Sequence, residues 1–130
     1  MRMPSTRAAV APMIERVLAA VRAAGLTHEQ QDNLAVAVAE ALSNAALHGH
    51  KLAAGRFVRV TVEVPAGGGA CVEVKDSGIG FDSAKVSDPT DPSRVLMPGG
   101  RGVFLMKRLV DHLEYNAAGN TVRLTMDARK

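Results

Sequence analysis

Three polar side chains within one stretch of the chain have the spacing to act on a metal ion or a reactive oxygen. Glu40, Asn44 and His48 are each four residues apart, so a helix places them on one face. We expect that face to lie opposite the apolar one presented by Leu34 and Val38. A carboxylate beside a neutral amide suits a divalent cation and the activation of a hydroxyl group or water. A solvated polar face explains the same pattern, so this group alone leaves both readings open.

A carboxylate followed by two glycines stands where a predicted strand ends. Asp76 shares a strand face with Val74, so its side chain is expected to point towards the core, where a carboxylate needs a donor. The amino group of a purine is one candidate donor, and nearby backbone N–H groups are the other. Gly78 and Gly80 would let the backbone approach a ligand closely, although a simple turn explains them equally well.

A third group, Gly99-Gly100-Arg101-Gly102, stands at the start of a predicted helix. The N-terminus of a helix with glycine-rich backbone and a cation is a ready site for an anion, while a flexible hinge is the alternative reading. The run does not match the phosphate-binding GxxxxGK[ST] loop. A purine site, a metal-binding helix face and a phosphate site together predict an ATP pocket.

The elements that must position these groups follow from hydrophobic periodicity. The spacing of apolar residues predicts a helix from Val10 to about Val21, and Thr27 with Gln30 forms a capping box for a second helix that runs out at His48-Gly49. The remaining predicted elements are a hairpin of strands over 56–64 and 71–76, a long loop over 77–100, a helix from near Gly102, and strands over 113–116 and 121–126. This order predicts an α+β fold, a two-layer sandwich with a largely antiparallel sheet and helices on one face.

Composition narrows the class of protein. A chain of 130 residues suits one domain over 1–130, and its single cysteine, Cys71, reads as a structural thiol. Without a long apolar run or a signal peptide, we expect no membrane association and a cytoplasmic location. The net charge is +3 with scattered basic residues and 3% aromatics, so we expect no direct binding of nucleic acid.

Three segments in this order resemble the N, G1 and G2 boxes of the GHKL (Bergerat-fold) ATPases: residues 40–49, 76–81 and 100–102. That superfamily includes gyrase, heat-shock chaperones, histidine kinases and mismatch-repair ATPases. Within it the chain is most similar to the stand-alone anti-sigma factors that act as serine-protein kinases, the RsbW type. Pro89-Thr90-Asp91-Pro92 and residues 100–106 favour that branch. The resemblance covers about residues 8–126.

The resemblance implies a role for each matching residue around bound ATP and Mg²⁺. Glu40 matches the general base and Asn44 the magnesium ligand, and residues 82–99 match the ATP lid. Asp76 would accept a hydrogen bond from the adenine amino group. The other matching residues are Gly78 and Gly80 in the adenine pocket, Gly100, Arg101 and Gly102 around phosphate, and Thr121 in support of adenine.

The chain also departs from the family pattern. Leu47 stands where a lysine is common, and Lys51 or His48 would have to replace that phosphate contact. The usual first strand is expected to be short or absent, because the chain starts almost at the first helix.

The implied function is that of an ATP-dependent serine/threonine kinase. It would bind a sigma factor, phosphorylate an anti-anti-sigma antagonist protein and form a homodimer. Glu40 favours catalysis, because a pure binding module would not need it. The alternative is a nucleotide-dependent module that binds a sigma factor without catalysis. A third reading is the detached catalytic domain of a histidine kinase. The lack of a preceding phosphoacceptor histidine and dimerisation helix argues against it.

Overall fold

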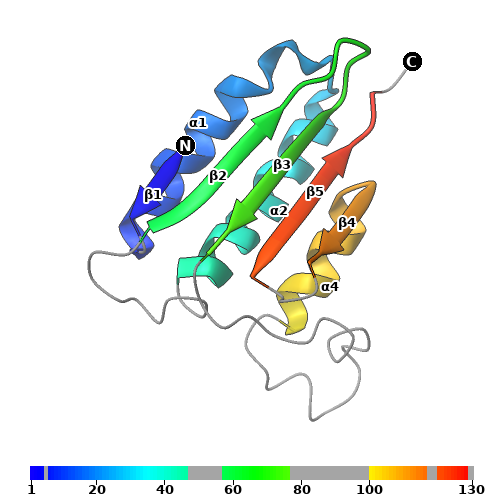
Figure 1. Ribbon diagram of the computed structural model, residues 1–130. Helices are drawn as coiled ribbons and strands as arrows, with labels where there is room; N and C mark the ends of the chain where they lie inside the picture. Colours follow the sequence, from blue (N-terminus) through cyan, green and yellow to red (C-terminus); the bar gives the residue numbers. More distant parts are fainter. Residues whose placement is uncertain (5, 47–56, 77–99, 117–119, 129–130) are drawn as a thin grey trace.

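The computed structural model describes residues 1–4, 6–46, 57–76, 100–116 and 120–128, without the side chains of residues 100–103 (Figure 1). Its elements, in chain order, are β1 (Arg2–Pro4), η1 (Arg7–Ala9), α1 (Val10–Ala20), η2 (Arg22–Ala24), α2 (His28–Asn44), β2 (Phe57–Glu63), β3 (Ala70–Lys75), α4 (Gly100–Leu109), β4 (His112–Tyr115) and β5 (Thr121–Met126). No helix in these described ranges is long and apolar enough to cross a membrane.

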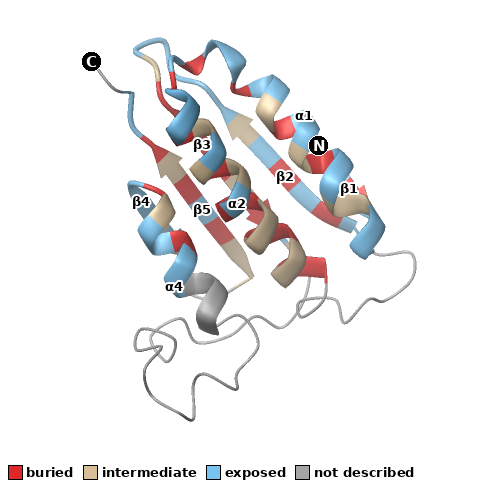
Figure 2. Cartoon of the chain, turned by 180° about the vertical axis from the view of Figure 1, so that it is seen from behind, coloured by how far each residue is buried: buried red, intermediate tan, exposed pale blue. Residues whose placement is uncertain are grey.

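The strands form one antiparallel sheet with the order β1-β2-β3-β5-β4. The sheet lies in front in Figure 1, and the view from behind in Figure 2 brings α1, α2 and α4 to the front. All three helices therefore cover the same face and leave the other face open. The predicted α+β sandwich is confirmed.

The first strand of the sheet is present but contains three residues, Arg2–Pro4. It pairs with β2, where Met1 and Val60 exchange two hydrogen bonds: Val60 N–H donates to the Met1 carbonyl (2.8 Å) and the Met1 ammonium group donates to the Val60 carbonyl (2.7 Å). Only Met3 of this strand is buried. With a single inward residue there is no alternation to detect, which is why periodicity did not predict the strand.

The core lies between the helices and the covered face of the sheet. Along β2 and β3 the valines alternate with exposed or half-buried polar residues, and Val58, Val60 and Val72 are completely buried. Leu34 and Leu42 of α2 are also completely buried and face them. Fully burying one such side chain contributes about 1.5–3 kcal/mol, so this face of α2 holds the helix on the sheet.

Helix α2 begins with the predicted capping box. The Gln30 backbone N–H donates to Thr27 Oγ1 (3.1 Å), and the Thr27 N–H donates to Gln30 Oε1 (3.0 Å). Gln30 is only 3% exposed, and its Nε2 donates to the Asp127 carbonyl (2.8 Å). One side chain therefore both starts the helix and fastens it to the segment after β5.

The hairpin between β2 and β3 closes through glycines in the left-handed region. Gly69 has φ of 82°, its N–H donates to the Ala24 carbonyl (2.8 Å), and a Cβ there would lie 2.8 Å from the Met126 carbonyl oxygen. No other residue fits this position without strain, because L side chains rarely adopt such a φ. The turn is thereby tied to η2 and passes close to the end of β5.

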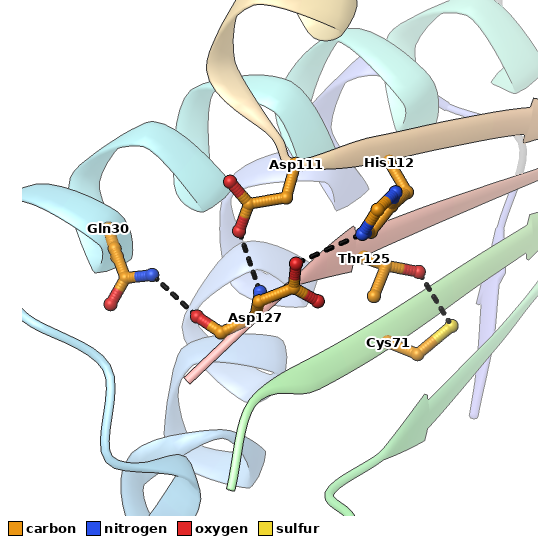
Figure 3. Close-up of polar contacts among 6 residues, drawn as sticks. All are labelled: Gln30, Cys71, Asp111, His112, Thr125 and Asp127. Atoms are coloured by element: carbon orange, nitrogen blue, oxygen red, sulfur yellow. Dashed lines mark hydrogen bonds and ion pairs between the residues drawn. The ribbon is translucent and has the colours of Figure 1, made fainter. Parts of the chain in front are cut away.

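A polar network ties the same end of the molecule together (Figure 3). Asp111 Oδ2 accepts a hydrogen bond from the Asp127 N–H (2.7 Å), and His112 Nε2 lies 3.0 Å from Asp127 Oδ2. With the Gln30 contact, Asp127 is linked to the start of α2, the end of α4 and the start of β4. We call the end that contains this network and the Gly69 turn the tied end.

Candidate functional site

The opposite end of the molecule collects the ends of four elements (Figure 1). Asn44 is the last residue of α2, Asp76 follows β3, Gly100 opens α4 and Thr121 opens β5. Helix α4 packs against α2. One pocket is lined by Thr27, Glu29, Gln30 and Asn33 together with residues 108–111, which shows that the start of α2 lies beside the end of α4. The two helices are therefore antiparallel, which brings the start of α4 to the end of α2.

The α2 residues of the site lie at the border of the core rather than opposite it. Glu40 and Asn44 are both half-buried, and Ala37, which neighbours them around the helix, is completely buried. The expectation that this face lies opposite the apolar one is wrong, because the buried stripe of α2 extends to Ala37, about one turn before Glu40.

Asn44 Nδ2 is buried and has no hydrogen-bond partner among the described residues. Burying an amide group without a partner costs about 1–3 kcal/mol, so such an atom calls for an explanation, of which a bound group is one. The oxygen and nitrogen of an asparagine amide exchange places when the group turns over, so the same position can present an oxygen ligand. The chemistry of Asn44 therefore fits both a metal ion and a phosphate oxygen.

Asp76 is half-buried beside the start of β5. Its backbone N–H donates to the Asn120 carbonyl (2.9 Å), which continues the ladder beyond the Lys75–Thr121 pair. Burial raises the pKa of Tyr115 above its ordinary value of 10.0, and the charge of Asp76 raises it further. Asp76 is thus close enough to Tyr115 to act on it electrostatically.

Thr121 is paired with Lys75, not with Asp76. The residue across from Asp76 is Asn120, whose Oδ1 accepts hydrogen bonds from Asn116 Nδ2 (2.7 Å) and Thr121 Oγ1 (3.2 Å). Sequence reasoning missed Asn120 and Tyr115 as neighbours of Asp76. No local pattern in the sequence points to Asn120, because its place across from Asp76 follows from the register between β3 and β5.

Helix α4 begins at Gly100, two residues before the predicted start near Gly102, so Gly100, Arg101 and Gly102 form its first turn. The first four backbone N–H groups of a helix have no partner within it, and the macrodipole favours an anion there. The predicted place of this run at a helix N-terminus is confirmed. The other predicted positions, His48, Leu47, Lys51, Gly78, Gly80 and the lid over 82–99, lie outside the described residues.

Within the described ranges, no group of three histidine, cysteine, aspartate or glutamate side chains could hold a metal ion. Of the described residues at this end, Asn44 has an amide that could bind a cation together with oxygen atoms brought by a ligand. Mg²⁺ is commonly bound in this way, by few protein groups together with phosphate oxygens.

A family model described as the histidine kinase-like ATPase domain matches residues 3–126. The chain belongs to this family. No curated protein matches the chain. Among solved structures, the ATPase domain is similar to the histidine kinase domain from Erythrobacter litoralis EL346 blue-light activated histidine kinase, with a TM-score of 0.56 and 20% sequence identity over 92% of the chain. The chain spans 65% of the length of that structure, and the likeness bears on the fold.

Membership in this family supports ATP binding and, more generally, ATP-dependent phosphoryl transfer. The end of the molecule with Asn44, Asp76 and the α4 N-terminus has the three kinds of group that ATP requires. These are a hydrogen-bond acceptor for a base, an amide suited to a cation, and a helix terminus suited to phosphate.

Proposed function

We propose that this ATPase domain is an anti-sigma factor of the RsbW type, a kinase that uses ATP and Mg²⁺ to phosphorylate a serine or threonine of an antagonist protein. The observation that carries the proposal is the buried Nδ2 of Asn44, one helical turn after Glu40, which has no hydrogen-bond partner among the described residues. A carboxylate and an amide in this order, at the end of the molecule with the α4 N-terminus, suit phosphoryl transfer to a hydroxyl group.

Each described residue has one task in this proposal. Asp76 accepts a hydrogen bond from the adenine amino group, with Asn120 beside it, and Thr121 keeps its predicted role in support of adenine. The first turn of α4, with Arg101, holds phosphate through its backbone N–H groups. Asn44 holds Mg²⁺, which when bound neutralises phosphate charge.

Glu40 supplies the chemistry that a binding module lacks. Its carboxylate accepts the proton of the acceptor hydroxyl as that oxygen bonds to the γ-phosphorus of ATP, while the bond from this phosphorus to the β–γ bridging oxygen breaks and ADP leaves. Positioning and electrostatics around the phosphates supply the rest of the catalysis. A group held as general base typically contributes about 10²–10⁴-fold to a rate. We extend the proposal to a cytoplasmic homodimer that binds a sigma factor as well as the antagonist.

The second candidate is a nucleotide-dependent module that binds a sigma factor without turnover. A third is the detached catalytic domain of a histidine kinase, the class of protein whose solved structure shares the fold. The three readings share the ATP site and differ in the fate of the γ-phosphate: a serine or threonine, nothing, or a histidine. Phosphohistidine is acid-labile and phosphoserine is not, so acid stability of the product separates the first reading from the third.

The test is transfer of label from γ-labelled ATP to a candidate antagonist, comparing Glu40→Gln with wild type. Glu29→Gln is the matched control, because Glu29 is an exposed glutamate of the same helix at the opposite end. We expect Glu40→Gln to bind ATP normally but to lose at least about 100-fold in transfer rate, with the control unchanged. Equal inactivity of wild type and Glu40→Gln on every antagonist that binds would overturn the kinase reading and leave the binding module.

A further inference from the structure

A stripe of three cations crosses the open face of the sheet. The register pairs Arg2 of β1 with Arg59 of β2, and Arg59 with Lys75 of β3, so the three lie in one row. All three are exposed, while the residues on either side of Arg59, Val58 and Val60, are completely buried against the helices. We call Arg2, Arg59 and Lys75 the basic stripe. In Figure 1 the open face is towards the viewer, and the row crosses β1, β2 and β3 near the start of β2.

The pairing geometry makes this row electrostatically costly. Met1 and Val60 exchange both of their hydrogen bonds, so the next pair, Arg2 and Arg59, is a non-hydrogen-bonded pair, in which facing side chains are closest. Like charges directly opposite each other destabilise a sheet. Within the described part of the chain, none of the three cations forms an ion pair with a carboxylate.

The neighbouring rows of the open face do not share this imbalance. Arg123 of β5 lies opposite Glu73 of β3, and its guanidinium is 3.7 Å from a carboxylate oxygen of Glu63. Glu114 of β4 pairs with Arg123 from the other side. These next rows hold one cation, Arg123, and three carboxylates, so the excess of positive charge on the open face lies in the basic stripe.

An exposed aromatic ring lies beside the stripe. Phe57 at the start of β2 is 45% exposed, and the Arg2 guanidinium sits 4.8 Å from the centre of its ring. This cation–π contact holds Arg2 in place before any partner arrives. Arginine and aromatic side chains in one exposed patch are the composition of the energetic centre of protein interfaces.

We propose that the basic stripe with Phe57 is a docking site for an acidic segment of a partner protein. Carboxylates on such a segment would complete the missing ion pairs, and an apolar side chain beside them would cover Phe57. A nucleic acid fits less well, because a phosphate backbone longer than the stripe would meet Glu73, Glu63 and Glu114 in the next rows. This inference goes beyond the proposed kinase function and does not depend on it.

The test uses a fluorescently labelled peptide of aspartate and glutamate residues with one leucine, titrated by anisotropy at low salt. The variant is Arg59→Gln/Lys75→Gln, and the matched control is Arg16→Gln/Arg22→Gln, which removes the same charge from exposed positions outside the sheet. We expect the variant to lose about tenfold or more in affinity and the control to lose little. Because the variant relieves repulsion, it should fold at least as stably as wild type.

Four results would overturn the proposal. The first is that the wild type does not bind the peptide, and the second is that both double variants lose affinity equally, which indicates an effect of net charge alone. The third is that a single-stranded oligonucleotide of equal charge binds more tightly than the peptide. The fourth is that sedimentation shows a wild-type dimer that only the stripe variant dissociates, which makes a second copy of the chain the occupant. ATP affinity, measured in parallel, should be the same in all three proteins. Loss of ATP binding would instead concern the nucleotide site.

Discussion

Asp76→Asn is the sharpest probe of the candidate site, because one substitution has two independent readouts. It keeps the shape of the side chain and leaves the backbone hydrogen bond from residue 76 to the Asn120 carbonyl in place. It removes the negative charge that raises the pKa of Tyr115 and that strengthens the hydrogen bond proposed for adenine. A defect in folding would change both readouts and lower the stability of the protein. An effect confined to the site would change the readouts and leave the stability unaltered.

The expected loss of ATP affinity follows from one hydrogen bond to a charged group. Such a bond contributes about 1.5–3 kcal/mol, which corresponds to a loss of about 10–150-fold. Calorimetric titration with ATP and Mg²⁺ measures it, and Asp32→Asn, an exposed aspartate of α2, is the matched control. Unchanged ATP affinity in a folded Asp76→Asn protein would refute the role of Asp76 in base recognition.

The second readout is optical. Tyr115 is the only tyrosine of a chain without tryptophan, so its ultraviolet absorbance during an alkaline titration reports this one residue. We expect Asp76→Asn to lower the pKa of Tyr115, while burial, the larger cause, keeps it above 10.0. An unaltered Tyr115 titration in the variant would mean that the carboxylate does not lie beside the phenol, and the site geometry itself would be wrong.

Three further predictions concern Asn44, the hairpin turn and alkaline pH. Asn44→Ala removes a buried Nδ2 that has no partner in the described part of the chain, so we expect thermal denaturation to show unchanged or slightly higher stability. Calorimetry should show no Mg²⁺-dependent gain in ATP affinity, and unfolding would make Asn44 structural. Gly69→Ala should cost about 1–3 kcal/mol in urea denaturation and Gly67→Ala almost nothing, because a Cβ meets the Met126 carbonyl at the first position and open space at the second. Because the folded state raises the pKa of Tyr115, the unfolded state ionises first as the pH rises. The contribution of Tyr115 to the free energy of unfolding is therefore complete below about pH 10 and falls above it. Urea midpoints measured against pH should show this alkaline decrease in wild type and not in Tyr115→Phe.

The regular core could be predicted from the sequence because its signals are local. The valines of β2 and β3 alternate strictly, and Thr27 with Gln30 is a helix start that needs only four residues. The short strand β1 gave no such signal, since its stability comes from pairing with β2 more than fifty residues away.

The site could be predicted as a set of motifs but not as a geometry. The half-buried position of Asn44 depends on how closely the side of α2 that contains Ala37 packs against the rest of the fold. Helical spacing does not contain that information. The placement of Asn120 across from Asp76 depends on a register between strands that are distant in sequence. Both properties depend on tertiary structure. Residue patterns therefore identified the types of group in the site but not which residues lie beside them.

The tied end has a consequence for how the protein can change. Gln30, Asp111, Asp127 and Gly69 join the start of α2, the start of β4, the end of β5 and the hairpin turn, all remote from Asn44 and Asp76. Substitutions that strengthen the tied end can therefore raise stability without touching the ligand site, and substitutions around Asn44 and Asp76 can alter the ligand without breaking these hydrogen bonds. The two traits can be engineered in separate libraries and then combined, since substitutions far apart without shared partners usually add.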